Sequence, residues 1–203
     1  NTNPIYIHIS LDASGSMSGE KWRSALKMAV AIAQAASMTT SMHVVISIRG
    51  TYGRDYPLMW TVYDSEKTKL LSVKTKLNAI SASGSTPEGL CFEAIQKEIV
   101  KQARNKEAYF INVSDGEPYF RVVGTSKGDG GNYSGRNAYT HTKDQVKKMT
   151  AAGINVISYF VSNYNSASEN YAFKMMYGDT AQFINVTQLN QLANSLNSNF
   201  ERK

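Results

Sequence analysis

Strand-like and helical patterns alternate along almost the whole of this 203-residue chain. Apolar runs rich in β-branched and aromatic residues predict strands at residues 5–11, 42–48, 58–63, 109–113, 154–161 and 181–185. Apolar residues at helical spacing predict helices at residues 19–37, 65–80, 90–102, 137–152, 167–177 and 188–200. Such alternation is typical of a mostly parallel sheet with helices on both faces, so we expect a doubly wound α/β fold.

The predicted strands at residues 42–48 and 58–63 are an exception to the parallel arrangement. The link between them is short and turn-rich, whereas a parallel return requires a crossover of roughly a dozen residues or more. We therefore expect an antiparallel hairpin, with residues 58–63 forming an edge strand. In the helix that follows, the expected core contacts are Leu70, Leu71, Leu77 and Ile80.

Composition bounds the class of protein. Hydrophobic residues make up 42% of the chain and charged residues 19%, as in ordinary globular domains. Cys91 is the single cysteine, which excludes an internal disulfide and a multi-cysteine zinc site and favours a reducing compartment. No apolar run is long enough to span a membrane.

The basic balance of the chain does not identify a partner. Lys and Arg outnumber Asp and Glu by 22 to 16, but they are scattered along helical segments without a clustered nucleic-acid-binding motif. We find no repeat or linker, so we expect one domain over residues 1–203. The start at Asn1 leaves open that this is the C-terminal part of a longer protein.

Oxygen donors follow the first predicted strand directly, in Asp12-Ala-Ser14-Gly-Ser16. A carboxylate and two hydroxyls at every second residue suit Mg²⁺, Mn²⁺ or Ca²⁺ better than zinc or copper. Three donors are too few for an octahedral ion, so we expect further ligands elsewhere in the chain. The alternative is that these residues only cap the next helix and shape a turn.

Two other loops supply further oxygen donors. Gly84-Ser-Thr86-Pro87 precedes a predicted helix, and Ser114-Asp115-Gly116 ends a predicted strand. Ligands of doubly wound sheets collect at the carboxyl ends of the strands, where these loops are expected to converge. We therefore predict one divalent-cation site, with an open position for a carboxylate of another molecule, formed by Asp12, Ser14, Ser16, Thr86 and Asp115.

The three motifs together resemble the metal-ion-dependent adhesion site (MIDAS) of a von Willebrand factor A (VWA) domain. The resemblance covers nearly the whole chain and implies a Rossmann-like sheet with an antiparallel edge strand. It also implies that Ser14, Ser16 and Thr86 coordinate a divalent cation, with Asp12 and Asp115 contributing charge or water-mediated contacts. Family members generally bind proteins, frequently through an acidic residue of the partner, and are not enzymes.

Three segments are similar to a narrower group, the CobT-like VWA proteins: residues 110–118, the long loop that follows them, and residues 174–178. CobT is the VWA-bearing subunit of cobaltochelatase and works with a MoxR-type AAA+ ATPase. This resemblance implies an adaptor for such an ATPase, in the cytoplasm and encoded by a bacterium or a phage. The acidic stretch that often precedes the domain in CobT is absent here, so a cobalamin role does not follow.

Alternative functions remain at this stage. A phosphatase or phosphotransferase of the haloacid dehalogenase type requires a second Asp two residues after Asp12, where Ser14 stands. An RNA-binding VWA module, as in Ro-type proteins, is allowed by the basic balance but supported by no motif.

The glycine-rich segment 119–139, which carries Arg121, Lys127 and Arg136, is either part of a partner surface or a mobile loop.

The histidines show no metal-ligand spacing. His8, His43 and His141 are well separated in the chain, and the first two fall within predicted strands. For both strand histidines we expect a structural role. Cys91 lies in an apolar helix start and is expected in the core.

Overall fold

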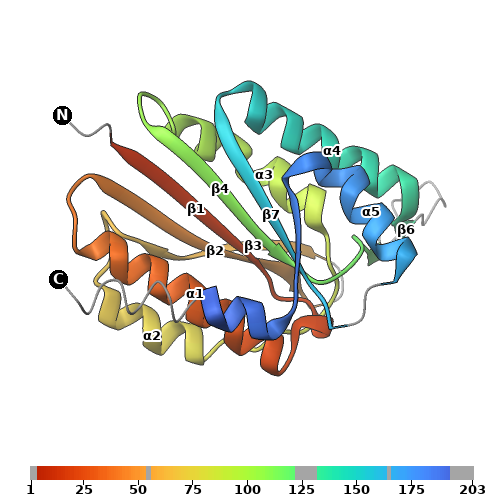
Figure 1. Ribbon diagram of the computed structural model, residues 1–203, viewed down its shortest axis with the longest axis horizontal. Coiled ribbons are helices and arrows are strands. Elements are labelled where there is room, and N and C mark those ends of the chain that lie inside the picture. Colours follow the sequence, from red (N-terminus) through yellow and green to blue (C-terminus); the bar gives the residue numbers. More distant parts are fainter. Residues whose placement is uncertain (1–3, 54–55, 122–131, 164–165, 193–203) are drawn as a thin grey trace.

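A mixed sheet forms the centre of the computed structural model, which describes residues 4–53, 56–121, 132–163 and 166–192 (Figure 1). Its strand order is β3-β2-β1-β4-β7-β8. Neighbouring strands pair in parallel except β2 and β3, which form an antiparallel hairpin at one edge. The strands are β1 (Ile5–Asp12), β2 (Met42–Tyr52), β3 (Tyr56–Asp64), β4 (Glu107–Ser114), β7 (Ile154–Val161) and β8 (Ala181–Ile184). The predicted α/β architecture with an antiparallel edge strand is confirmed.

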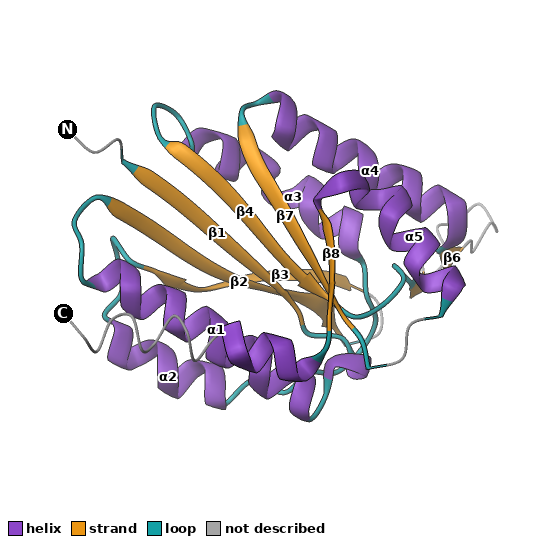
Figure 2. Cartoon of the chain, viewed as in Figure 1, coloured by secondary structure: helices purple, strands orange, loops and turns teal. Residues whose placement is uncertain are grey.

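Helices cover both faces of the sheet (Figure 2). On one face lie α1 (Glu20–Ser37) and α2 (Leu70–Asn78), together with a helical segment at residues 186–192. On the other face lie α3 (Glu88–Gln102), α4 (Gly135–Ala151) and α5 (Ala167–Tyr177). Within the described ranges, none of the helices is both long and apolar enough to cross a membrane.

Alternating strand residues divide the core between the two faces. In β4, Val113 packs with the α1 side and Phe110 with the α3 side. Because both faces are covered, β1 and β4 read as nearly continuous apolar runs. The apolar face of α1 is buried at helical spacing by Trp22, Ala25, Ala29, Ala33 and Ala36, as predicted.

The expected core of α2 is wrong in one position, Leu71, and the helix begins at Leu70 and not at residue 65. The preceding residues form a turn in which the backbone N–H groups of Lys67 and Thr68 donate to the Asp64 carbonyl. Val73 and Leu77, one helical turn apart, face the sheet, and Leu71 is about 200° around the helix from Val73. Leu71 therefore lies on the outer face and is 81% exposed.

A buried ion pair joins the sheet to α3. The Arg49 guanidinium, on β2, donates to the Glu88 carboxylate in the first turn of α3, and both side chains are almost fully buried. Arg49 also donates to the carbonyls of Ser10 (2.9 Å) and Val113 (3.2 Å). Burial raises the pKa of Glu88, and the positive charge of Arg49 opposes that rise. One side chain thus connects β2 with β1, β4 and α3.

Replacing Glu88 by Gln leaves the Arg49 charge buried without its counter-charge. We expect the free energy of unfolding to fall by about 3 kcal/mol, the order observed when one partner of a buried pair is removed. Urea unfolding of Glu88→Gln and of the exposed control Glu93→Gln, on the same helix, measures the difference. Equal losses in the two variants would show that the buried pair is not a major anchor.

Candidate metal centre

Asp12 ties the first motif to the neighbouring strand. It is fully buried at the carboxyl end of β1. Its Oδ1 accepts a hydrogen bond from the Ser14 backbone N–H at 2.8 Å, which closes the tight loop. Its Oδ2 accepts from the Ser114 hydroxyl at 3.0 Å, across to the end of β4. One carboxylate therefore fixes the loop after β1 and holds it against the loop after β4.

The side-chain oxygens of Ser14, Ser16 and Asp115 lie next to one another. Ser14 Oγ and Ser16 Oγ are 3.1 Å apart, and Ser16 Oγ donates to Asp115 Oδ1 at 2.7 Å. Neighbouring ligands of an octahedral Mg²⁺ at 2.0–2.1 Å are separated by about 3 Å. The spacing and chemistry of these donors therefore fit a small, hard cation. Ser14 is buried while Ser16 is exposed, so the group faces solvent on one side.

Backbone contacts hold the Thr86 loop against the first loop. The Gly15 N–H donates to the Gly84 carbonyl at 3.0 Å, and the Ser83 N–H donates to the Ala13 carbonyl at 2.8 Å. Thr86 itself is buried and exchanges two backbone hydrogen bonds of 2.9 Å with Tyr119, after β4. The three loops thus share one edge of the sheet. Thr86 is held at this end of the sheet by hydrogen bonds of its backbone.

Only glycine suits position 84 of this loop. Its φ is +83°, and a Cβ there would lie 2.2 Å from the Thr51 hydroxyl at the end of β2. The close approach lets the Thr51 hydroxyl accept a hydrogen bond from the Ser85 N–H at 3.3 Å. The hairpin therefore supports the Thr86 loop from the side.

A lysine places a positive charge beside the side-chain oxygens of Ser14, Ser16 and Asp115. Lys21, at the start of α1, donates to Asp115 Oδ2 at 2.7 Å, and its side chain is 26% exposed. Burial and the negative charge of Asp12 raise the pKa of Asp115, while the hydrogen bonds from Lys21 and Ser16 oppose that rise. Two carboxylates close together in a buried place favour a bound cation. Sequence reasoning missed Lys21, although its position one helical turn after the motif could have indicated it.

The segment after Asp115 is fastened to α4. The Tyr139 hydroxyl donates to the Glu117 carboxylate, and Phe120–Arg121 (β5) pairs with Asn132–Tyr133 (β6). Tyr119, beside Thr86, is 47% exposed. Lys127 and the rest of residues 122–131 lie outside the described residues.

Comparison by sequence finds no match, either with protein-family models or with curated proteins. Comparison with solved structures does. The VWF domain of the type V pili tip protein Mfa5 from Porphyromonas gingivalis has a TM-score of 0.71 at 10% identity, over 99% of this chain and 96% of that one. The pilus adhesin SpaC from Lactobacillus rhamnosus GG has a TM-score of 0.69 at 13% identity, over 98% of this chain.

This chain spans about a third, 31%, of the length of SpaC. A further similar structure is proximal thread matrix protein 1 from the mussel byssus, with a zinc-occupied MIDAS motif. It has a TM-score of 0.65 at 12% identity, over 96% of this chain and 47% of that one. At such identities the likeness shows the fold alone. The chain has the von Willebrand factor type A fold.

Proposed function

We propose that this chain is a divalent-cation-dependent protein-binding module. Ser14, Ser16 and Thr86 would hold the metal, and Asp12 and Asp115 would contribute charge or water-mediated contacts. The observation that carries the proposal is the chain of oxygen contacts from Ser14 through Ser16 to Asp115, which joins loops far apart in sequence. The occurrence of a metal-occupied MIDAS motif in a protein of the same fold supports it.

The chemistry of these donors favours binding over catalysis. Neutral hydroxyls at Ser14, Ser16 and Thr86 leave much of the charge of a divalent ion uncompensated, so the metal attracts a further anion. Ser16 is exposed, which gives a partner carboxylate access from solvent. Mg²⁺ retains exchangeable waters that such a carboxylate can replace, and Mn²⁺ or Ca²⁺ would accept the same donors. The proposed role is therefore that of a bridge between two proteins, without turnover.

The partner we propose to test first is a MoxR-type AAA+ ATPase, in the cytoplasm of a bacterium or a phage-infected cell. This choice comes from the CobT-like segments at residues 110–118 and 174–178. The pilus adhesin and pili tip proteins of the same fold make a cell-surface protein the other partner class to test. In either case the partner would supply an acidic side chain to the metal.

Replacing Asp115 by Asn removes one carboxylate of the proposed site and leaves its size unchanged. We expect Mn²⁺ affinity to fall by about 10- to 100-fold, as for other groups that support a metal from outside its direct ligands. Isothermal titration of the wild type and of the exposed control Asp144→Asn provides the comparison. Equal Mn²⁺ affinities in all three proteins would rule out this site.

Removing the ammonium of Lys21 should have the opposite effect. Lys21 pairs with Asp115 at 2.7 Å, so it competes with the metal for the same carboxylate. We expect Lys21→Met to raise Mn²⁺ affinity by about two- to fivefold, in line with the energy of a partly exposed ion pair. Lys27→Met, on the outer face of the same helix, is the matched control. Weaker Mn²⁺ binding by Lys21→Met would mean that Lys21 supports the metal site instead.

Partner binding should depend on the metal. In a pull-down with the immobilised chain, we expect specific proteins to be retained with Mg²⁺ and released by EDTA, and to be absent with Asp115→Asn. Retention of the same proteins in EDTA would contradict a bridging metal. Retained RNA that is released by salt but not by EDTA would favour the RNA-binding alternative.

A further inference from the structure

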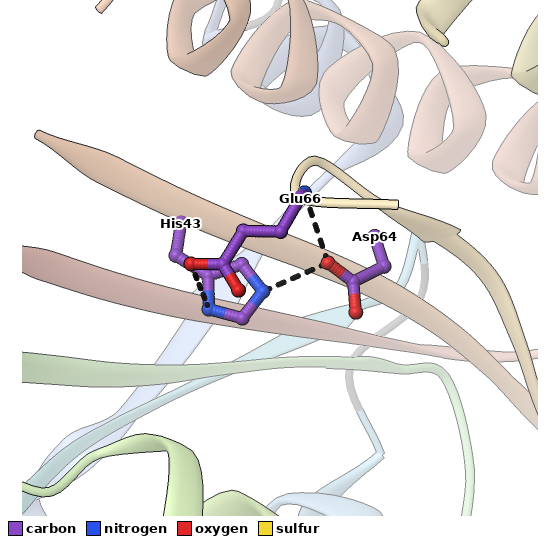
Figure 3. Close-up of side chains that lie close together, drawn as sticks. All are labelled: His43, Asp64 and Glu66. Atoms are coloured by element: carbon purple, nitrogen blue, oxygen red, sulfur yellow. Dashed lines mark hydrogen bonds and ion pairs between the residues drawn. The ribbon is translucent and has the colours of Figure 1, made fainter. Parts of the chain in front are cut away.

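A second group of side chains that could ligate a metal is formed by His43, Asp64 and Glu66, which lie close together (Figure 3). His43 is near the start of β2, Asp64 ends the antiparallel strand β3, and Glu66 lies in the following turn. One possible ligand atom from each residue lies within 4.8 Å of the others. Because β2 runs parallel to β1, its start is at the edge away from Asp12. The two sites are therefore separate.

Hydrogen bonds define which nitrogen of His43 carries the proton. Its Nε2 lies 2.9 Å from Asp64 Oδ1, which can only accept, so in the neutral imidazole Nε2 carries the proton. Its Nδ1 then keeps a lone pair, which the Lys106 ammonium faces at 3.5 Å. Histidines that bind metals commonly have this arrangement, with one nitrogen held by a carboxylate and the other free to coordinate.

The imidazole of His43 is held firmly in this orientation. Its side chain is 4% exposed and packs against the Tyr6 ring, with centroids 5.1 Å apart. Asp64 Oδ1 is fixed in turn by the Glu66 backbone N–H, which donates to it at 3.0 Å. The lone pair of Nδ1 thus points in a direction set by the fold and not by a mobile side chain.

The carboxylate next to His43 Nδ1 is more exposed to solvent than the imidazole itself. Glu66 Oε1 is 3.5 Å from His43 Nδ1, and the Glu66 side chain is 58% exposed. Two ligands of a tetrahedral Zn²⁺ at their usual bond lengths are separated by about 3.4 Å, so this spacing needs little adjustment. A pocket of about 530 Å³ opens beside these residues, and its lining includes Thr39, Ser41 and Ser65. Water in this pocket can complete a coordination shell.

We infer that His43 Nδ1 and the Glu66 carboxylate form a second metal site for a borderline transition metal such as Zn²⁺. Asp64 orients the imidazole from behind, as a positioning residue. Lys106, 3.9 Å from Glu66 Oε1, is the cation that neutralises the group when the metal is absent. An imidazole with a carboxylate suits Zn²⁺ better than Mg²⁺, whereas the MIDAS-like group offers oxygen alone. The two sites would therefore differ in their preference between Zn²⁺ and Mg²⁺.

Zinc titration in saturating Mg²⁺ tests this site independently of the first one. We expect one Zn²⁺ bound by the wild type, an affinity at least about tenfold lower for Glu66→Gln, and a higher affinity for Lys106→Met. Glu107→Gln, exposed at the same edge of the sheet, is the matched control and should bind like the wild type. His43→Gln should abolish the binding and leave the Mn²⁺ affinity of the first site unchanged.

Two results would overturn the inference. One is the absence of Zn²⁺ binding by the wild type in Mg²⁺. The other is a Zn²⁺ affinity that Glu66→Gln leaves unchanged; because Glu66 is exposed, this variant gives a clear result even if His43→Gln fails to fold. The proposed MIDAS function would survive both, since it is tested by Mn²⁺ binding to Asp115→Asn.

Discussion

The parallel pairing of β1 with β4 is the constraint on which the candidate metal centre depends. Leu11 lies opposite Val113 in this pair, so β1 and β4 end side by side and their following loops start at the same end of the sheet. The hydrogen bond from Ser114 Oγ to Asp12 Oδ2 then joins loops 102 residues apart in sequence. An antiparallel pair would bring the end of one strand to the start of the other, and the two loops could not meet.

At each of the two candidate metal sites, a lysine lies beside the carboxylates. Asp12 and Asp115 lie close together at one edge, with Lys21 on Asp115. At the other end of the strands, Lys106 lies close to both His43 and Glu66. In each case a lysine on a flexible stem provides the positive charge that a metal ion could replace. Arg49 differs, because its guanidinium is buried, paired with Glu88 and bonded to carbonyls on two strands. It serves the packing of the sheet.

The sequence was sufficient to predict the elements that depend on local pattern. The strands, the antiparallel hairpin and the buried face of α1 follow from periodicity, turn residues and the length of a link. The place of Leu71 does not, because Leu70 and Leu71 are both apolar and only the packing of α2 decides which of them faces the sheet. Leu71 lies two residues before the buried Val73, about 200° around the helix, and so faces away from the sheet.

Some residues of the candidate sites could be predicted from local sequence patterns and others could not. Asp12, Ser14, Ser16, Thr86 and Asp115 were predicted to converge because each stands beside a strand or helix end, and the structure places their loops at one edge. Lys21, Glu88 and the cluster around His43 were not predicted. His43 and Asp64 meet only because the hairpin register brings residues 21 apart into contact, and spacing along the chain does not reveal this.

The most direct test of the metal-binding claim is a crystal structure of the chain grown with Mn²⁺, in which anomalous scattering locates the ion. We predict an anomalous peak within about 2.3 Å of both Ser14 Oγ and Ser16 Oγ, with Asp12 and Asp115 around it. An anomalous map with no peak at these hydroxyls, at a Mn²⁺ concentration that saturates the protein in solution, would contradict it.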